Sequence, residues 1–482
     1  MRDPILDAHE VLRGFYLISG GLSPISIRDQ MLRGQLVVER LAENRLINGD
    51  TQLLVVGAGV GGVTAAICAA RKGVRTILVE KTLAPFGVQR RGATRFLNPT
   101  QYDWPVDHWP YGVFPWLNSH VQLPLPYPTD WAGILVALWE KELRKAEHDL
   151  RPLLTYFDET APAEIDPDLL PGQLTVRFSG GWTATDTFEA IIWAAGSGEE
   201  ECRLFAHPQI PQPNPIYEGR SFWSTDPLTA TNLGVLGHAP RVLISGSGDG
   251  GLQDYLRVVT RYDSAEQLYR MCNIPQEIAD RIQSAEDRAH RGRAWAREDK
   301  NFRKIHEQPF LQELHQEHQE AIEDALSVTD VYQSLEQLFP VAPPYVVLVY
   351  REPYFTNYYG LNRFLVLLVD HFLRKKFGQA TLRPETMIID VSTKNTDGHV
   401  CMVQVGGEWQ PAGGYRAPTC HGRNHEVFLQ DTQGISSDQF NVIIVRHGLL
   451  HNTVPLPPLP QEALEKLPLV HSRQLLPYHL PA

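Results

Sequence analysis

Residues 51–81 read TQLLVVGAGVGGVTAAICAARKGVRTILVEK. An apolar segment at 53–56 is followed by Gly57, Gly59 and Gly62, which have the spacing G-x-G-x-x-G. A helical pattern then leads to a second apolar segment, 74–79, that ends in Glu80. A strand, a glycine turn, a helix, a strand and a terminal acid in this order are typical of a βαβ dinucleotide-binding unit. The stretch therefore predicts that the chain binds a dinucleotide.

Each glycine has its own function in such a unit. Gly57 makes the tight turn, Gly59 lets the backbone approach a pyrophosphate, and Gly62 lets the helix pack closely on the strand. The helix N-terminus offers free N–H groups and a positive dipole end to the phosphates, and Glu80 can accept hydrogen bonds from a ribose hydroxyl. The residues expected at this first cofactor are Gly57, Gly59, Gly61, Gly62, Glu80 and Lys81.

Two later segments extend the pattern. Residues 241–251 repeat a strand and a glycine turn, with Gly246, Gly248 and Gly251 at the turn. Residues 187–196, TFEAIIWAAG, close an antiparallel meander and end in Gly196. With the Val-Glu-Lys ending of the first unit, these segments resemble the superfamily of two-dinucleotide-fold flavoproteins, which includes glutathione-reductase-like enzymes and class B flavin monooxygenases. The resemblance implies FAD at the first unit, close to Gly196, and NAD(P)H at the second.

The sequence predicts an α/β protein with two Rossmann-like dinucleotide-binding domains, the second carrying a helical insertion. We expect an N-terminal helical arm at 1–50 and an FAD-binding domain at 51–215, which contains an aromatic and proline-rich loop at 85–131. The second domain covers 216–450. Its next strand is expected only at 345–350, so the charged stretch 263–340 is interpreted as the insertion. The proline-rich segment 451–482 is expected to be an extended C-terminal arm.

Composition narrows the class of protein. The 482 residues are 43% hydrophobic and carry a net charge of −12, which gives no basic stripe for nucleic acid. The most apolar helix pattern, 361–377, contains charged residues, so no membrane span is predicted. The five cysteines are scattered and favour a reduced, cytoplasmic compartment. We expect no metal site and a small-molecule substrate.

The cysteine positions also limit the chemistry. Disulfide reductases of the resembled group need two thiols in C-x-x-x-x-C after the first unit, but residues 86–91 read FGVQRR. Electron transfer from NAD(P)H to oxygen or a small acceptor remains, as does direct oxidation of a substrate by FAD. Residues 217–223 resemble the F-x-G-x-x-x-H stretch of class B monooxygenases, except that Trp223 replaces the histidine. This difference argues against a Baeyer–Villiger enzyme.

Five residues are candidates for catalytic roles: Arg95, Tyr102, Trp104, Arg446 and His447. Tyr102 and Trp104 belong to the aromatic loop, which is expected either to line the reaction pocket or only to pack. Arg95 could stabilise an anionic flavin or bind a substrate carboxylate. Arg446 and His447 follow a strand that resembles the return strand of the first domain, so they are expected near the domain interface.

Two further features bear on the second domain. Asp249 lies at the start of its first helix, where a carboxylate is expected to cap the helix and repel a pyrophosphate. A domain that no longer binds nucleotide is therefore an alternative. His315 and His318 lie one helical turn apart among glutamates and are interpreted as part of a solvated face.

The sequence predicts an FAD-dependent oxidoreductase that uses NAD(P)H to reduce the flavin, and oxygen to oxidise or hydroxylate a small organic substrate. One alternative is an amine or amino-acid oxidase, or a dehydrogenase, whose second domain binds no nucleotide. Another is a flavoprotein interaction or sensor module in which residues 263–340 bind a protein partner. Homo-oligomerisation through the same segment is also open.

Overall fold

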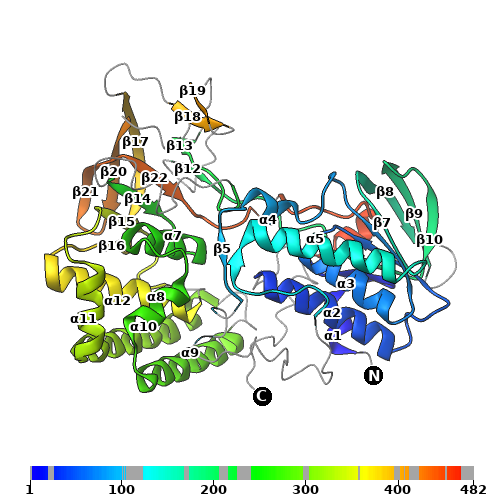
Figure 1. Cartoon of the computed structure of the whole chain (residues 1–482), viewed down its shortest axis with the longest axis horizontal. Coiled ribbons are helices and arrows are strands. Elements are labelled where there is room, and N and C mark those ends of the chain that lie inside the picture. The colour runs from blue at the N-terminus through cyan, green and yellow to red at the C-terminus, as the bar shows by residue number, and fades with distance from the viewer. Residues whose placement is uncertain are drawn as a thin grey trace.

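The computed structural model describes residues 3–19, 26–99, 101, 104, 123–167, 173–205, 215–224, 240–296, 303–355, 359–395, 402–405, 408–411, 423–450 and 453–467. The chain forms two α/β domains that lie side by side (Figure 1), as the sequence predicts. Tyr102 and residues 105–122 of the aromatic and proline-rich loop 85–131 lie outside the described residues. No helix among the described residues is both long enough and apolar enough to cross a membrane.

The first domain is built on a six-stranded sheet in the order β1-β2-β11-β3-β4-β7. Its strands are β1 (Glu10–Leu12), β2 (Phe15–Leu17), β3 (Gln52–Val56), β4 (Arg75–Val79), β7 (Leu154–Phe157) and β11 (Ala190–Trp193). All neighbours are parallel except β1 and β2. The central strand β3 has an almost continuous apolar sequence because both faces of the sheet are covered.

Helices cover one face of this sheet and a second sheet covers the other. The helices are α2 (Ile27–Glu43), α3 (Val60–Arg71) and α5 (Ala132–Asp149), and the second sheet contains β8 (Thr160–Pro167), β9 (Leu174–Gly180) and β10 (Thr185–Phe188). The antiparallel β8-β9-β10 sheet is the meander that the sequence predicts, and β11 returns from it into the main sheet between β2 and β3.

Residues 1–50 are part of the first domain rather than a helical arm. After α1 (Pro4–His9), β2 pairs with β11 in the main sheet. Helix α2 packs against α3 so closely that a Cβ atom on Gly34 would lie 2.4 Å from the carbonyl oxygen of Gly61. The sequence pattern showed an amphipathic helix here, but three-residue strands have too little periodicity to be recognised.

The C-terminal segment also returns to the first domain. The Pro458 carbonyl accepts a hydrogen bond from the Ile165 N–H at 3.0 Å, and the Pro455 carbonyl accepts one from the Trp193 indole at 3.2 Å. Beyond them, Leu459 and Leu467 are buried on either side of α13 (Gln461–Leu464). The segment was expected to be an extended arm, yet its apolar residues complete the core between the main sheet and the β8-β9-β10 sheet.

The second domain repeats this architecture at smaller scale. Its parallel sheet has the order β16-β15-β14-β22. The strands are β14 (Val242–Ser245), β15 (Val346–Val349), β16 (Leu382–Arg383) and β22 (Val442–Val445). Helices α7 (Asp249–Thr260) and α12 (Gly360–Phe377) share a core with one face. The antiparallel strands β17 (Met387–Asn395), β20 (Arg423–Asp431) and β21 (Gly434–Phe440) cover the other.

The predicted helical insertion lies between α7 and β15. It contains α8 (Ala265–Cys272), α9 (Gln276–Ala296), α10 (Arg303–Ser327) and α11 (Thr329–Leu338). Leu268, Ile322 and Leu335 of the insertion are buried in the same core as α7 and α12. The insertion is therefore part of the second domain and not a separate module.

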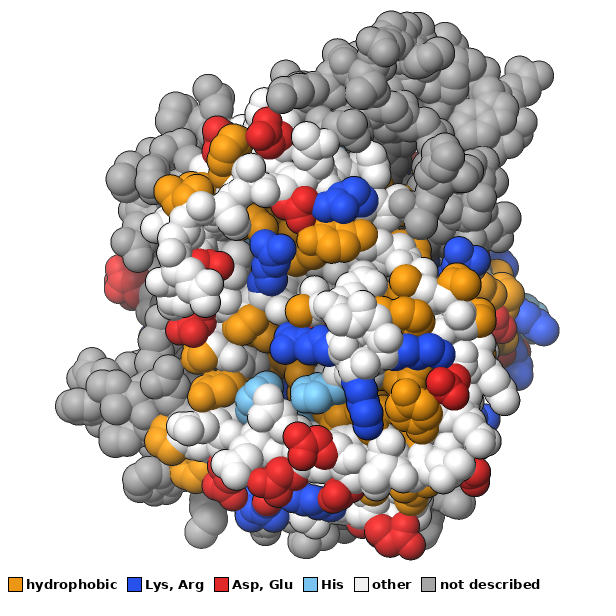
Figure 2. Space-filling model, turned by 90° about the vertical axis from the view of Figure 1, so that its left-hand side faces the viewer, with side chains coloured by type: hydrophobic (Ala, Val, Ile, Leu, Met, Phe, Trp, Pro, Cys, Tyr) orange, Lys and Arg blue, Asp and Glu red, His pale blue; other side chains and the backbone are white. Residues whose placement is uncertain are grey.

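The charged surface of the insertion is largely neutralised. Arg281 of α9 pairs with Glu317 and Asp324 of α10, both at 3.0 Å. Acidic and basic side chains accordingly lie together along the lower part of the domain in Figure 2. His318 does not belong to this solvated face: it is fully buried and forms a 2.9 Å hydrogen bond with Glu286, which also pairs with Arg363 at 2.5 Å.

Short elements complete the fold. They are α4 (Gly87–Arg91), β5 (Phe96–Leu97), β6 (Asp130–Trp131), β12 (Arg203–Leu204), β13 (Tyr217–Glu218), β18 (Met402–Val405) and β19 (Glu408–Pro411). The pairs β5-β6 and β12-β13 are antiparallel. In Figure 1, β5 lies between the two domains, close to α8.

The contact between α2 and α3 gives a first prediction. We expect Gly34→Val to destabilise the protein by roughly 1–3 kcal/mol, because the new side chain must push α2 away from the Gly61 backbone. Urea denaturation measures the change. Gly49→Ala is the matched control, since its Cβ would meet only the Gly73 carbonyl oxygen at 3.8 Å. Equal stabilities of the two variants would contradict the close helix packing.

Candidate functional site

The first glycine turn has the geometry that its sequence predicts. Gly57 has φ +101°, and a Cβ atom there would lie 2.5 Å from the Ala194 carbonyl oxygen at the end of β11. A Cβ atom on Gly62 would lie 1.9 Å from the Gly57 carbonyl oxygen. Both positions therefore exclude any side chain, Gly57 because of its conformation and Gly62 because of the close approach of helix and turn.

Open space lies where a pyrophosphate would approach. A Cβ atom on Gly59, which precedes the first turn of α3, would meet no other atom within 4 Å. The same is true of Gly196, which has φ +99° and follows β11. Glu80 reaches the turn from the end of β4, and its carboxylate accepts a 2.8 Å hydrogen bond from the Ala58 N–H. These residues fit a dinucleotide whose phosphates lie at the N-terminus of α3.

Two of the residues expected at the cofactor have other surroundings. Gly61 faces α2, and a Cβ atom there would lie 3.0 Å from the Gln30 carbonyl oxygen. Helix packing therefore accounts for its lack of a side chain. Lys81 is exposed beside Glu80 at the start of the loop after β4.

The second glycine turn reproduces the backbone of the first. Gly246 has φ +110°, and a Cβ atom there would lie 2.1 Å from the Arg446 carbonyl oxygen, which follows β22. A Cβ atom on Gly251 would lie 2.1 Å from the Gly246 carbonyl oxygen, and one on Gly248 would meet nothing within 4 Å. Gly246, Gly248 and Gly251 thus correspond to Gly57, Gly59 and Gly62, so the second turn also has room for a phosphate.

Asp249 differs from its expected role as a helix cap. Gly248 is the N-cap of α7, and no side chain caps that helix. The Oδ1 atom of Asp249 instead accepts hydrogen bonds from the Tyr359 N–H at 3.0 Å and from the Asn362 side-chain amide at 2.9 Å, at the N-terminus of α12. Burial raises the pKa of Asp249 to about 7, against the opposing effect of these hydrogen bonds and of Arg363.

A buried ionic cluster joins the two domains. The Asp254 side chain on α7 is fully buried. One carboxylate oxygen pairs with Arg95 of the first domain and, at 3.3 Å, with Arg257; the other pairs with Arg446 at 2.8 Å. Burial alone would raise the pKa of Asp254, but the three guanidinium groups hold it well below its usual range. The carboxylate is therefore ionised at neutral pH.

The same cluster holds Phe222, which lies in the segment that links the two domains. The Arg95 Nε–H donates to the Phe222 carbonyl at 2.7 Å, and the Arg95 guanidinium lies over the Phe222 ring, 3.8 Å from its centroid. Glu200 accepts a hydrogen bond from the Phe222 N–H, and burial raises the pKa of Glu200. Trp223, which replaces the family histidine, packs against Gly92 after α4, where a Cβ atom would lie 2.8 Å from the indole.

His447 stabilises the second glycine turn through a hydrogen bond. It forms a 2.8 Å hydrogen bond through Nε2 with the hydroxyl of Ser245, the residue before Gly246. Burial lowers the pKa of His447 to about 4, and the positive charge of Arg351 adds to the effect. The imidazole is therefore neutral at neutral pH, which suits a structural hydrogen bond better than proton donation.

Trp104 of the aromatic loop contacts the second domain. Trp104 stacks on Phe364 of α12 with ring centroids 5.4 Å apart, and it meets Tyr269 of α8 edge to face at 5.3 Å. The indole therefore packs against the core of the second domain, which favours the packing interpretation of this residue. Of the candidate catalytic residues, the structure brings Arg95 and Arg446 together on Asp254, with His447 next in sequence, and it places Trp104 elsewhere.

Sequence reasoning missed Asp254, Phe222 and Glu200. Asp254 lies within the helix that follows the second glycine turn, and nothing in its sequence neighbourhood shows that another domain covers this side chain. The only sequence signals were Arg446, which was expected near the domain interface, and Arg95, which was expected to contact the flavin or a substrate carboxylate.

The described cysteines are poor redox groups. Cys68, Cys202 and Cys272 are free and buried. Burial raises the pKa of Cys68 to about 12, that of Cys202 to about 11 and that of Cys272 to about 12. Because the thiolate is the reactive form, these three residues are not suited to a dithiol relay. In the described part of the chain, no three His, Cys, Asp or Glu side chains are grouped so that they could hold a metal.

The first glycine turn also has a match among known families. Residues 52–89, which cover β3, α3, β4 and the start of α4, match the family model described as FAD dependent oxidoreductase. Over these residues the chain is similar to FAD-dependent oxidoreductases. FAD is therefore the cofactor that the Gly57–Gly62 turn and Glu80 are built to hold. No curated protein matches the chain.

Solved structures with similar folds include reductases and monooxygenases. Thioredoxin reductase from Lactococcus lactis has a TM-score of 0.37 at 12% identity, over 83% of this chain and 78% of that one. The bacillithiol disulfide reductase Bdr from Staphylococcus aureus has a TM-score of 0.36 at 9% identity, over 83% and 76%. A flavin-containing monooxygenase from Stenotrophomonas maltophilia has a TM-score of 0.27 at 16% identity, over 42% and 53%. Similarities this low do not decide between these activities.

The open space at Gly59 gives a prediction about the cofactor. We expect Gly59→Asp to purify without bound FAD, because it places a negative charge where the pyrophosphate approaches. The ratio of flavin to protein absorbance measures the loss. Gly59→Ala is the control for folding, since the methyl group meets no other atom within 4 Å. A Gly59→Asp variant that keeps full flavin occupancy would show that FAD binds elsewhere.

Asp249 gives a prediction about pH. Its folded pKa of about 7 lies above the unfolded value of ~3.9, so the folded protein binds an extra proton between these values. Stability contributed by Asp249 is therefore lost as the pH rises from about 4 to 7, with a slope of up to ~1.4 kcal/mol per pH unit. Asp249→Asn keeps an oxygen that can accept both hydrogen bonds but cannot titrate.

Urea denaturation of the wild type and Asp249→Asn between pH 5 and pH 8 tests this linkage. We expect the variant to become more stable than the wild type as the pH rises, because all other groups are shared. A stability difference that does not change with pH would mean that Asp249 titrates normally.

Proposed function

We propose that the chain is an FAD-dependent oxidoreductase in which NAD(P)H binds at the second glycine turn and reduces the flavin. The electrons then pass to oxygen, with oxidation or hydroxylation of a small organic substrate. The observation that carries the proposal is the second turn, whose three glycines have the same backbone geometry and the same open position as those of the first.

The fit of each nucleotide rests on residues of this chain. Gly59 and Glu80 would hold the pyrophosphate and a ribose of FAD, and Gly248 would admit a second pyrophosphate at the N-terminus of α7. FAD, when bound, supplies the electron transfer between nicotinamide and acceptor. The task of the protein is to place the two sites relative to each other. The Arg95–Asp254–Arg446 cluster does this by fixing α7 against the first domain.

The buried thiols support an acceptor other than a protein disulfide relay. Cys202 is near the interdomain linker, because its carbonyl accepts a hydrogen bond from the Gly219 N–H at 2.8 Å. Yet its thiol is buried and its pKa is raised to about 11. Oxygen or a small organic molecule therefore suits the described residues better as the electron acceptor.

An oxidase or dehydrogenase is the second candidate function. It is favoured by the surroundings of the second turn, where a Cβ atom on Gly250 would lie 3.1 Å from the Phe222 ring. Asp249 also adds a negative charge at this turn when it is ionised. In this case an amine or amino acid would reduce the flavin directly, and the second domain would bind no nucleotide.

A third candidate, a sensor or interaction module, would use the insertion to bind a protein partner. The insertion is packed into the second domain core, and α9 and α10 neutralise each other by ion pairs. These features support a structural role for α8–α11 more than a free binding surface.

Anaerobic flavin reduction decides between these functions. We expect NADH or NADPH to bleach the flavin of the wild type within seconds to minutes. Gly248→Asp should slow bleaching at least tenfold at low nucleotide concentration, because the carboxylate opposes the pyrophosphate, while FAD content stays unchanged. Gly248→Ala is the control for folding, since its methyl group meets no other protein atom within 4 Å, and dithionite should bleach all three proteins.

Other outcomes assign the function differently. Bleaching by an amine or amino acid, but by neither nicotinamide nucleotide, would establish the oxidase or dehydrogenase. Bleaching by none of these donors would favour the sensor module. Equal rates for Gly248→Asp and the wild type would show that the nucleotide does not bind at the second turn.

A further inference from the structure

One hydrogen bond in each domain shows which residues correspond at the two glycine turns. The Gly57 N–H donates to the carbonyl of Val79, the last residue of β4, at 2.8 Å. The Gly246 N–H donates to the carbonyl of Val349, the last residue of β15, at 3.0 Å. The residues that directly follow these two strands therefore have equivalent places beside the two turns.

The two equivalent places hold different chemistry. Glu80, after β4, is an acid whose carboxylate reaches the first turn, and an acid at this place suits a ribose hydroxyl. Tyr350, after β15, is only 5% exposed, and its ring packs against Phe355 with centroids 4.8 Å apart in the core of the second domain. The second domain therefore has no carboxylate at the place where the first domain has one.

Arg351 is the next residue along the chain, and its side chain is exposed. Within the described part of the chain, its guanidinium takes part in no ion pair and no hydrogen bond. Its charge lies close enough to the second turn to help lower the pKa of His447, whose Nε2 bonds to Ser245 directly before that turn. A cation without a carboxylate partner therefore lies beside the second turn.

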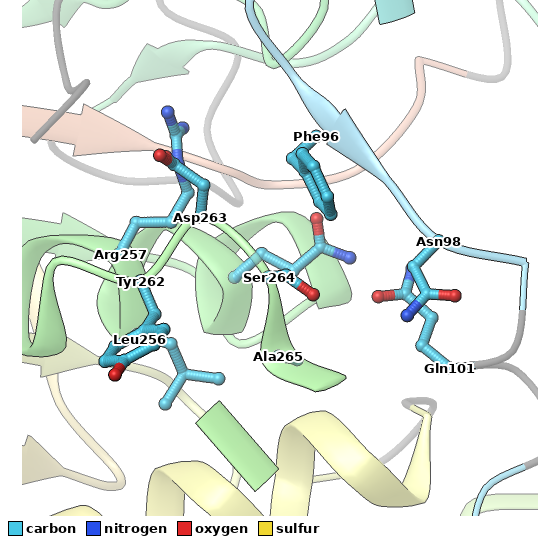
Figure 3. Close-up of a pocket in the computed structure, with 10 residues that line it drawn as sticks. Phe96, Asn98, Gln101, Leu256, Arg257, Tyr262, Asp263, Ser264 and Ala265 are labelled. Atoms are coloured by element: carbon cyan, nitrogen blue, oxygen red, sulfur yellow. The ribbon is translucent and has the colours of Figure 1, made fainter. Parts of the chain in front are cut away.

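Two other arginines of the second domain are already paired. Figure 3 shows the side chain of Arg257 beside Asp263 at the C-terminal end of α7, where its Nε–H donates to the carboxylate at 3.0 Å. Arg257 also pairs with Asp254 at 3.3 Å, and Arg446 pairs with Asp254 at 2.8 Å. An anionic ligand would have to compete with these carboxylates, whereas at Arg351 it would not.

The acid that follows Arg351 has a different position. Glu352 is exposed, and its carbonyl accepts a hydrogen bond from the Glu385 N–H at 3.4 Å, between β16 and β17. Its backbone therefore pairs with that connection and not with the second turn. A carboxylate would favour a ribose hydroxyl, and a guanidinium would favour a phosphate. Of the two residues, Arg351 is the one whose charge acts on a residue of the turn.

We propose that the second nucleotide site prefers NADPH to NADH, and that Arg351 recognises the 2′-phosphate by which the two differ. The inference rests on the proposed function, because it concerns the nucleotide at that same site. A phosphate group of this kind carries up to about two negative charges at neutral pH. A guanidinium matches it with two parallel N–H donors, which gives both charge and geometry.

Titration calorimetry of the FAD-loaded protein with NADP⁺ and NAD⁺ tests this preference without turnover. The oxidised nucleotides keep the 2′-phosphate difference and cannot reduce the flavin. We expect NADP⁺ to bind at least about tenfold more tightly than NAD⁺. Arg351→Gln should weaken NADP⁺ binding by about tenfold to a hundredfold, as expected for the loss of a charged hydrogen-bonding partner. It should change NAD⁺ binding by less than about threefold.

Arg261→Gln is the matched control. Arg261 is exposed at the C-terminal end of α7, the opposite end of the helix from the second turn. The control should therefore bind both nucleotides like the wild type. Arg351→Lys keeps the charge but loses the planar fork, so it should keep part of the preference for NADP⁺. Because Arg351 is exposed, its variants should keep the FAD content and the urea midpoint of the wild type.

The outcomes separate a wrong residue assignment from a wrong site. If Gly248→Asp weakens binding of both nucleotides but NADP⁺ is not preferred, or Arg351→Gln binds like Arg261→Gln, the site stands and the proposal for Arg351 is wrong. A preference for NAD⁺ that Glu352→Gln removes would assign the ribose contact to Glu352 instead. If neither nucleotide binds, or Gly248→Asp leaves binding unchanged, the proposed nucleotide site is wrong and the preference for NADPH fails with it.

Discussion

A single buried carboxylate fixes how the two domains meet. Asp254 has no exposed side-chain surface, and it pairs with guanidinium groups from the first domain, from its own helix and from the end of β22. Loss of one partner from such a cluster typically costs ~3–5 kcal/mol, because the remaining charges stay buried without compensation. The geometry is therefore stringent: only an arrangement that brings Arg95 and Arg446 together on α7 avoids that cost. The relative position of the two glycine turns follows from this constraint.

The same cluster explains where the chain crosses between the domains. Arg95 holds Phe222 by a hydrogen bond and by contact with its ring, so the chain must cross between the domains at this point. Arg446 contributes its side chain to Asp254 and its carbonyl group to the wall of the second turn at Gly246. Residues far apart in sequence therefore share one electrostatic environment, in which Arg95 of the first domain and Arg257 and Arg446 of the second surround one carboxylate.

Local sequence patterns predicted most of the fold. They did not predict the site residues whose roles depend on contacts with distant parts of the chain. The glycine turns, the meander, the late strand β15 and the helical insertion all follow from short-range periodicity and spacing, and the structure has them. The N-terminal strand β2 and the C-terminal segment were missed because three-residue strands and proline-rich chain have no periodicity. The close approach of Gly61 to α2 is another contact that no local pattern reveals. Asp254 was missed for the same reason, since its burial depends on the other domain.

The two glycine turns have the same backbone geometry, but their acidic residues lie at different positions. In the first, the acid is Glu80, which reaches the turn from the end of β4 and leaves the N-terminus of α3 open. In the second, Asp249 lies in the first turn of α7 and faces the N-terminus of α12, so the positive ends of two helices converge on one carboxyl group. Its pKa of about 7 means that this group is partly protonated at neutral pH. A phosphate bound at Gly248 would repel the ionised form and so raise that pKa. By linkage, the protonated form must bind the phosphate more tightly, which makes the occupancy of the second site depend on pH in a way that the first site does not share.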